Sequence, residues 1–489
     1  MTARTDAFAR DTRWTRAAGL HEGSVRGRRY VFNPAGHDSL TLLTARAARL
    51  LDAADGRALD AIAASTGDAV EALEGELATL HARGIVTSDA VPLPPRAEEK
   101  RFNVWVHVTN ACNLDCPYCY IEKDAHGLSE DTARALRDSL VATARSGAVE
   151  RIHLRFAGGE PMLRFAFVRR FFDETRDALA REGATLTAAI ITNGTVVPDD
   201  AAAWMVANNV SVSISLDGVG EAQDAMRPAV GGGGSFARVI AGIERLVAGG
   251  VSPYMLATVA AANLDQMPSL TDFFLDRALG FRYSLVRDLD GGAALLDHRG
   301  AGWSERSSVV SLRRAPNVTA ARAPMLEGEA LARVQAVFAE CYARVARRMP
   351  VAPSFRRTHR FCDLELTRPI ARACGAGERY VAVSDRGRVS PCHAALHEEG
   401  ARPLAAGASL VEVAPSLTQL GDFRRRAPVD ECARCAWKNS CAGGCPLLLF
   451  RRDGHVDGRS PYCEVFRFVI PRILELGALE ALLEEGVTS

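Results

Sequence analysis

The sequence has no net charge and almost no lysine. Lysine plus arginine and aspartate plus glutamate number 59 each among 489 residues, so no overall field favours binding to nucleic acid or to an anionic membrane. Only Lys100, Lys123 and Lys438 are lysines, which we interpret as a trace of genomic base composition. An apolar content of 48% is ordinary for a globular protein that builds a core, and the length predicts two to four domains.

Long apolar runs are also missing. No stretch approaches the roughly 18 residues that a membrane-spanning helix needs, so no membrane partner is expected. Charged residues interrupt the first twenty positions, which excludes the apolar core of a signal peptide; they are Arg4, Asp6, Arg10, Asp11, Arg13 and Arg16. The sequence therefore predicts a cytoplasmic protein. In that compartment the twelve cysteines favour metal or redox chemistry over disulfides.

Three cysteines share one short loop, Cys112-Asn-Leu-Asp-Cys116-Pro-Tyr-Cys119, directly after a strand-like stretch. Three thiolates can hold three corners of a [4Fe–4S] cube and leave the fourth iron open for a substrate or cofactor. A structural zinc site needs a fourth ligand, and no cysteine or histidine stands at zinc-finger spacing here. His107 is close in sequence, but its place on a strand favours a backbone or side-chain partner. The loop predicts an iron–sulfur site with an open position.

The C-x3-C-x2-C spacing, with Tyr118 before the last cysteine, resembles the signature of the radical S-adenosylmethionine (radical SAM) superfamily. The resemblance implies that the open iron binds the amino and carboxylate groups of SAM. It also implies cleavage of SAM to a 5′-deoxyadenosyl radical, which abstracts hydrogen from a C–H bond, and an external electron donor such as a flavodoxin or ferredoxin. The protein would supply orientation and shielding for chemistry that belongs to the cofactor.

Strand-like and helical patterns alternate through residues 101–290, which predicts βα units and a parallel sheet. The strand candidates are Val104–Val108, Ile152–Phe156, Ala189–Thr192, Val210–Leu216, Tyr254–Val259 and Phe281–Val286. Amphipathic helices are predicted between several strands, for example at Glu130–Ala144 and Phe236–Val247. The resemblance implies that these units form a partial (β/α)6 barrel, an α/β fold with its site at the C-terminal strand ends.

Polar motifs follow three of these strands. Gly158-Gly159-Glu160-Pro161 resembles the GGEP motif of the superfamily, which implies that Glu160 holds the SAM amino group. Two glycines let a backbone approach a ligand closely. Asn193 follows the next strand and is a further candidate for cofactor binding.

The third motif is Ser215-Leu-Asp217-Gly, followed by a Q-D-x-x-R segment that ends at Arg227. The superfamily pattern is SLDG with H-D-x-x-R, and Gln223 stands here in place of the histidine. The resemblance implies that Ser215 and Arg227 contact the ribose and carboxylate of SAM and that Tyr118 lies by the adenine. In the alternative interpretation, Asp217 and Arg227 form a structural ion pair.

Seven cysteines gather near the C-terminus, in residues 351–475. They are Cys374, Cys392, Cys432, Cys435, Cys441, Cys445 and Cys463. Their spacing resembles the cysteine signature of the SPASM domain, which carries two auxiliary clusters in peptide-modifying radical SAM enzymes. Three [4Fe–4S] clusters are thus implied in all. A pair of zinc ribbons is the structural alternative.

The resemblance also implies how these cysteines are divided. One auxiliary cluster is expected on Cys432, Cys435, Cys441 and Cys463, and the other on Cys374, Cys392 and Cys445. The fourth corner of the second cluster is either Cys362, which we favour, or open to a substrate thiol. Cys341 lies in a predicted helix and is expected to be a packed apolar thiol.

Residues 1–95 contain no cysteine. Strand-like stretches at 30–34 and 40–44 precede helical patterns at Ala45–Ala53, Ala58–Ala64 and Ala69–His81. This succession resembles the winged-helix leader-binding domain of the PqqD type. The resemblance implies a leader segment bound as an added strand beside Tyr30–Asn33 or Leu40–Thr44. An accessory helical domain is the alternative. Residues 291–350 are predicted to hold an irregular insertion and a bridging helix, Glu329–Arg347.

Together the resemblances predict an oxidoreductase that matures a ribosomally synthesised precursor peptide. The product would carry a thioether, a C–C or C–O crosslink or a related oxidation. A formylglycine-forming sulfatase maturase is the first alternative, but that family has an aspartate base where this chain has His393. A non-catalytic iron–sulfur scaffold is the second, and it would need no SAM pocket.

Overall fold

The computed structural model describes residues 11–36, 40–94, 100–287, 326–349, 374–396, 401–417, 430–453 and 456–486, together with 361, 364, 366, 369 and 370. Cys362 and most of the predicted insertion lie outside these residues. None of the described helices is long and apolar enough to cross a membrane.

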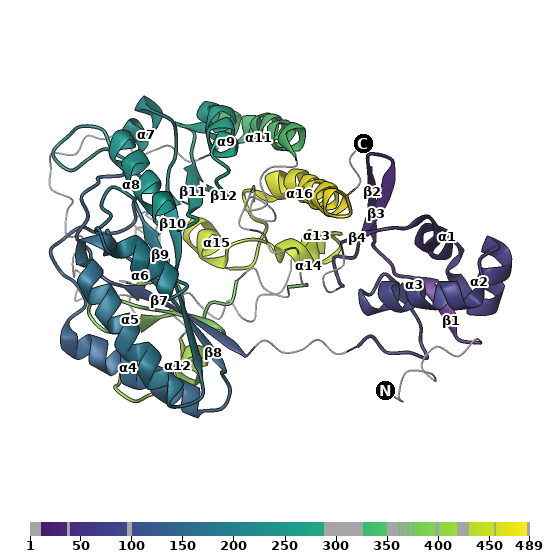
Figure 1. The fold of residues 1–489 in the computed structure, drawn as a ribbon, viewed down its shortest axis with the longest axis horizontal. Helices are drawn as coiled ribbons and strands as arrows, with labels where there is room; N and C mark the ends of the chain where they lie inside the picture. The colour runs from purple at the N-terminus through teal and green to yellow at the C-terminus, as the bar shows by residue number, and fades with distance from the viewer. Residues whose placement is uncertain are drawn as a thin grey trace, which may run out of the picture.

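Six parallel strands form the central sheet, as the alternating pattern predicted (Figure 1). They are β7 (Arg101–His107), β8 (Arg151–Ala157), β9 (Thr185–Thr192), β10 (Ser211–Ser215), β11 (Tyr254–Val259) and β12 (Phe281–Leu285). Each strand pairs with its neighbour in chain order. β9 begins four residues earlier than predicted, because Thr185-Leu-Thr continues the pairing with β8.

Helices follow the strands and bury one side of the sheet. The main ones are α4 (Glu130–Arg145), α5 (Phe165–Ala180), α6 (Ala201–Ala207), α7 (Glu221–Met226), α8 (Phe236–Ala248) and α9 (Met267–Asp276). Alternate strand residues such as Val104, Leu154 and Phe156 are fully buried in their shared core. Because side chains alternate along a strand, the residues between them face the interior of the partial barrel.

The C-terminal module continues the same sheet, which the sequence did not predict. β13 (Tyr380–Val383) pairs in parallel with β7, and β14 (Arg388–Ser390) and β15 (Arg402–Pro403) add antiparallel strands beyond it. Three short helices then carry or flank the later cysteines: α13 (Asp430–Ala433), α14 (Lys438–Cys441) and α15 (Pro446–Asp453). The cysteine-rich module is therefore fixed to the edge strand of the barrel.

Two long helices and one short helix complete this part of the fold. α11 (Gly328–Arg348) matches the predicted bridging helix, and it contacts α9 and α16 (Cys463–Glu484). Cys341 of α11 is fully buried among apolar residues, as predicted. The short helix α12 (Leu410–Val413) contacts α4.

The N-terminal module has its own core. It contains α1 (Ala45–Ala53), α2 (Leu59–Thr66) and α3 (Val70–Ala82), close to the predicted bounds. One sheet consists of β1 (Arg13–Arg16), β5 (Asp55–Ala58) and β6 (Val86–Thr87), and a second of β2 (His21–Val25), β3 (Arg28–Phe32) and β4 (Thr41–Leu42). Trp14, Leu50 and Leu77 are fully buried in a cluster separate from the main core.

Of the two predicted sites for an added strand, the one beside Tyr30–Asn33 is wrong, and the one beside Leu40–Thr44 stays a prediction. β3 is the central strand of its sheet, with β2 on one side and β4 on the other. An added strand therefore cannot pair beside Tyr30–Phe32, and the outer edges of this sheet are β2 and β4. The sequence hid β2 because His21-Glu-Gly-Ser-Val has no apolar alternation, and only Val25 of that strand is buried.

The N-terminal module rests on the C-terminal one. The rings of His21 and Phe32 lie 5.1 and 6.5 Å from the ring of Trp437. Helix α16 contacts β2 and β4, and Figure 1 shows it reaching toward that sheet from the yellow end of the chain. Segments from the two ends of the sequence thus meet on one surface.

We predict that Leu50→Ala destabilises the N-terminal module by about 2 to 5 kcal/mol, the usual cost of a large cavity in a core. Hydrogen exchange should accelerate in α1, α2 and α3 and remain unchanged in β8 and β9. Leu93→Ala, the same substitution at a side chain that is 43% exposed, is the control and should change little. Equal acceleration in the barrel strands would show that the two cores unfold as one.

Candidate functional site

The predicted motifs meet at the C-terminal ends of the parallel strands. The cysteine loop follows β7, Gly158–Glu160 follows β8, Asn193 follows β9 and Asp217 follows β10. In a parallel sheet these ends lie on one edge, which is where such folds place their sites. The fold therefore brings together residues that are separated by more than a hundred positions in sequence.

The cysteine loop is a compact turn of free thiols. The Cys119 amide donates to the Cys116 carbonyl at 3.1 Å, and none of the described cysteines forms a disulfide. Burial raises the pKa of Cys116 to about 12 and also raises the pKa of Cys112. A bound metal would replace those protons, because thiolate is the ligating form. Three thiols on one loop are a donor set that fits an iron–sulfur cluster.

The glycine pair packs against this loop. The Gly159 amide donates to the Thr109 carbonyl at 2.6 Å, and the Glu160 amide donates to the Ala111 carbonyl at 2.8 Å. A Cβ atom on Gly159 would lie 2.2 Å from the Ala111 oxygen, so no other residue fits without movement. The close approach that these glycines allow is an approach to the backbone of the cysteine loop.

Glu160 is a fully buried carboxylate. It accepts hydrogen bonds from the Thr192 hydroxyl at 2.7 Å, the Asn193 amide at 2.7 Å and the Met162 amide at 2.9 Å. Burial raises the pKa of Glu160 to about 7, although these hydrogen bonds act to lower it. The Asn193 side chain donates to Cys112 Sγ at 3.8 Å, so Asn193 links the carboxylate to the cysteine loop.

Asp217 and Arg227 form a buried ion pair, as the structural alternative predicted. Arg227 Nε lies 2.7 Å from Asp217 Oδ2, and their side chains are 11% and 0% exposed. The Tyr118 hydroxyl donates to the same carboxylate. Arg227 Nη1 also donates to Cys116 Sγ at 3.9 Å. The pair is therefore part of the site, because it connects the strand β10 motif to the cysteine loop.

Gln223 has a role that sequence reasoning missed. Its side-chain oxygen accepts a hydrogen bond from the Asp217 amide at 2.7 Å, and its amide group donates to the Ser235 hydroxyl. The sequence feature that could have indicated this role is the position of Gln223 in the Q-D-x-x-R segment. Ser215, the other predicted residue of this motif, lies half-buried at the end of β10.

A second network ties the cysteine loop to the C-terminal module. His107 Nε2 lies 2.6 Å from Asn110 Oδ1, in line with the expected side-chain partner. The Asn110 amide donates to Asp385 Oδ2 at 3.2 Å. Asp385 is buried in the turn between β13 and β14. The Asp385-Arg-Gly387 sequence signals a turn, but its contact with Asn110 spans 275 residues.

The later cysteines fall into the two predicted groups. Burial raises the pKa of Cys441 to about 12, and Cys463, Cys432 and Cys435 are close enough to raise it further. Cys392 behaves in the same way beside Cys445 and Cys374. No three His, Cys, Asp or Glu side chains of the described residues converge closely enough for a single metal ion, whereas a cluster keeps its ligands apart on separate irons.

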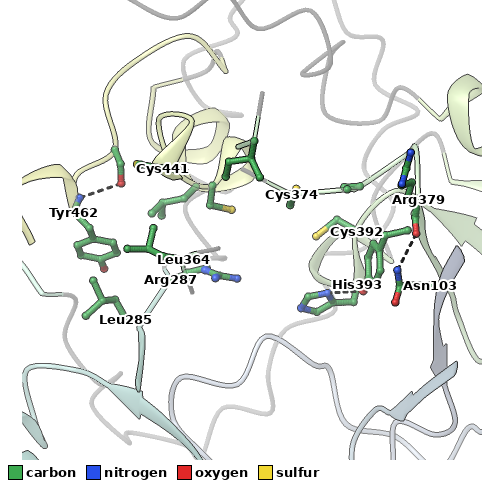
Figure 2. A pocket seen from close by; sticks show the side chains of 18 of the residues that line it. Asn103, Leu285, Arg287, Leu364, Cys374, Arg379, Cys392, His393, Cys441 and Tyr462 are labelled. Carbon is green, nitrogen blue, oxygen red and sulfur yellow. Dashed lines mark hydrogen bonds between the residues drawn. The ribbon is translucent and has the colours of Figure 1, made fainter. Parts of the chain in front are cut away.

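A cavity of about 380 Å³ separates the barrel from the C-terminal module. In Figure 2, Cys392 and His393 lie on one side of it, and Leu285 and Tyr462 lie on the other. The His393 ring stacks on Trp105 with centroids 4.2 Å apart. His393 Nδ1 also lies 2.8 Å from the Tyr380 hydroxyl. The cavity is thus lined jointly by barrel residues such as Asn103 and Leu285 and by C-terminal residues that include Cys374, Cys392 and Cys445.

Comparison with known proteins places these features in context. Residues 106–268 match the radical SAM superfamily. Mycofactocin maturase MftC of Mycobacterium ulcerans is 26% identical over 368 residues, which cover 73% of this chain and 86% of that protein. The chain spans 40% of a serine-type anaerobic sulfatase-maturating enzyme of Bacteroides thetaiotaomicron, with 30% identity over 169 residues. It spans 42% to 54% of two further relatives.

Solved structures share the fold. Native anSMEcpe with bound AdoMet matches with a TM-score of 0.58 and 16% identity, over 77% of this chain and 98% of that one. Streptococcus suis SuiB bound to the precursor peptide SuiA matches with a TM-score of 0.53 and 13% identity, over 92% of this chain and 100% of that one. We conclude that residues 106–268 form a SAM-binding domain of the radical SAM superfamily.

Proposed function

We propose that the protein is a radical SAM maturase that oxidatively modifies a ribosomally synthesised precursor peptide. The observation that carries the proposal is the cavity shared by the barrel and the second group of cysteines. Barrel residues and Cys374, Cys392 and Cys445 line it together. A substrate in this cavity would lie against the barrel that holds the SAM site and beside the cysteines that would hold an electron acceptor.

Cys112, Cys116 and Cys119 would hold the [4Fe–4S] cluster that binds SAM. When bound, the cluster and SAM supply a radical that removes hydrogen from a C–H bond. Glu160 would accept hydrogen bonds from the SAM ammonium group, since a carboxylate is a strong acceptor for such a donor. Asn193 would keep Cys112 beside that carboxylate.

The Asp217–Arg227 pair would orient the carboxylate of the cofactor and, through Tyr118, its adenine. A guanidinium has five N–H donors, so Arg227 can hold Asp217 and still bind the carboxylate of SAM. Tyr118 is fixed by its hydrogen bond to Asp217, which suits a place beside the adenine. Ser215, at the end of β10, would bind the ribose.

The C-terminal cysteines would hold two auxiliary [4Fe–4S] clusters. We assign one to Cys432, Cys435, Cys441 and Cys463 and the other to Cys374, Cys392 and Cys445, with Cys362 as its fourth ligand. Cysteine ligation needs free thiolates, so such an enzyme would work in a reducing compartment such as the cytoplasm. A flavodoxin or ferredoxin would supply the electron that starts each reaction.

A peptide substrate is supported by the relatives and by the N-terminal module. The named function of MftC and the precursor peptide bound to SuiB both concern peptides. The edges of β2 and β4 are available for strand addition by a leader segment. The product could be a thioether, a C–C or C–O crosslink or a related oxidation.

A sulfatase-maturase activity is the weaker candidate. The residue after Cys392 is His393, which is stacked on Trp105 and bonded to Tyr380. This imidazole stands where the sulfatase-maturase family is expected to have an aspartate base. The match to the sulfatase-maturating relative also covers only 33% of this chain.

We predict that changing Cys112, Cys116 and Cys119 to Ala abolishes SAM cleavage but leaves a folded, brown protein. The C-terminal clusters have their own ligands and should survive. Reductive formation of 5′-deoxyadenosine is measured in the reconstituted wild-type and triple variant, and Cys341→Ala serves as the control with a cysteine buried away from the site. Undiminished 5′-deoxyadenosine formation by the triple variant would contradict the assignment of these three cysteines to SAM cleavage.

SAM binding should weaken as the pH falls below 7. Burial raises the pKa of Glu160 to about 7 in the SAM-free protein, and a bound ammonium group favours the ionised carboxylate. Protonation therefore opposes binding, and Kd should rise by up to about tenfold per pH unit between pH 7 and about pH 5. Calorimetric titration measures this slope. Glu160→Gln should bind SAM weakly, with a Kd that does not change over this pH range. A pH dependence of Kd that persists in this variant contradicts the assignment.

Deletion of residues 1–95 should weaken binding of the precursor peptide and leave SAM cleavage without peptide largely intact. The helices of the N-terminal module have a separate core, only its second sheet, with Tyr30 and Phe32, joins the main core, and the predicted cofactor residues all lie outside the module. Peptide modification is followed by mass spectrometry with full-length and leader-free peptides. If the truncated enzyme processes the full-length peptide with unchanged kcat/KM, the leader-binding role is wrong.

A further inference from the structure

The interior wall of the barrel carries arginines and no acidic residue. The six strands β7 to β12 contain neither aspartate nor glutamate. Arg101, Arg155 and Arg282 occupy positions that alternate with buried residues of the outer face. Arg155 is exposed and Arg101 and Arg282 are half-buried. The wall therefore presents arginines and no carboxylate from the six strands.

Arg155 is the most distinctive of these residues. It lies beside Trp105 of β7 in the sheet register, and its side chain opens into the cavity. It makes no hydrogen bond or ion pair with any residue in the part of the chain that the structure describes. Burial lowers the pKa of Arg155, Tyr380 opposes that effect, and the neighbouring Arg282 and Arg101 lower the pKa further. Its surroundings thus disfavour its charge unless an anion binds.

The cavity shows the same excess of arginine over acidic residues. Arg101, Arg155, Arg287 and Arg379 line it, and none of its described lining residues is an aspartate or glutamate. Its volume of about 380 Å³ falls in the range of small-ligand pockets, although an auxiliary cluster would take part of it. A group held by Arg155 would share this cavity with Cys374, Cys392 and Cys445.

We propose that Arg155 binds a carboxylate of the substrate peptide in this cavity and so selects the segment that is modified. The inference rests on the proposed function, because the anions of an unmodified peptide are carboxylates. A guanidinium pairs with a carboxylate through two parallel hydrogen bonds. The carboxylate comes from an aspartate or glutamate side chain or from the C-terminus of the peptide.

The neighbouring cavity arginine, Arg287, has a different role. Arg287 is close enough to Cys392 and Tyr120 to affect their pKa values, so it can balance the charge of a cluster on that wall. The charged or titratable neighbours of Arg155 are instead Tyr380, Arg282 and Arg101, and no cysteine is among them. Arg101, Arg287 and Arg379 each have an interaction within the protein, so Arg155 is the cavity arginine that we assign to the substrate.

The experiment uses four short peptides on the reconstituted, SAM-bound, full-length protein. Two are acetyl-Gly-Asp-Gly-amide and its Asn counterpart; two are acetyl-triglycine with a free C-terminus and its amide. Calorimetric titration should show that one acidic peptide binds at least about tenfold more tightly than its neutral partner, which is about 1.4 kcal/mol. A preference within the first pair identifies an acidic side chain as the source of the carboxylate, and a preference within the second pair identifies the C-terminus.

Variants of Arg155 test whether this residue causes the carboxylate preference. Arg155→Gln should remove the preference, and Arg155→Lys should keep part of it because the charge remains. Arg151→Gln is the matched control: Arg151 begins the same strand, is exposed and does not line the cavity, so the preference should be unchanged. Equal binding of acidic and neutral peptides to the wild-type protein, or no binding at all, overturns the proposal. A preference that survives in Arg155→Gln also overturns it.

The proposed function is tested by a separate measurement. It is tested by 5′-deoxyadenosine formation in the wild-type protein, which needs none of these peptides. Absence of SAM cleavage with an intact carboxylate preference would overturn the maturase and leave an anion site in the cavity. Normal SAM cleavage with no carboxylate preference would overturn only the role of Arg155.

Discussion

The candidate site depends on one close contact between two loops at the ends of β7 and β8. Gly159 and Glu160 donate backbone hydrogen bonds to the cysteine loop, and the approach is so tight that a Cβ on Gly159 would overlap the Ala111 oxygen. This contact places the Glu160 carboxylate next to Asn193 and thus next to Cys112. Without it, the cysteines and the carboxylate would belong to independent loops.

Buried charge gives the site its second constraint. Asp217 and Arg227 leave water together, which is costly unless their hydrogen bonds are satisfied. Tyr118, Thr258 and Gln223 supply those bonds to the side chain or backbone of Asp217. The pair is thus held rigidly beside Cys116. Arg155 differs from Arg227 because its side chain lacks such a partner among the described residues, and this contrast separates the arginine assigned to SAM from the one assigned to the substrate.

The C-terminal module is joined to this arrangement by backbone pairing. β13 extends the barrel sheet next to β7, and Asp385 in the turn that follows reaches Asn110 of the cysteine loop. The module therefore turns Cys392 toward the cavity rather than toward solvent. The sequence predicted its cysteine groups but not this junction, because three short strands with few residues carry a weak pattern and their partner lies about 280 positions away.

The sequence by itself determined the six parallel strands and most of the helices. Each of these depends on the pattern within a short segment, where side-chain periodicity is a local property. Only the tertiary structure decided that β3 is an inner strand and that Asp217 and Arg227 meet Tyr118 and Cys116. It also decided that Arg155 opens into a cavity whose described lining residues include no aspartate or glutamate. These facts depend on which distant segments pack together, and burial then decides which charges find partners.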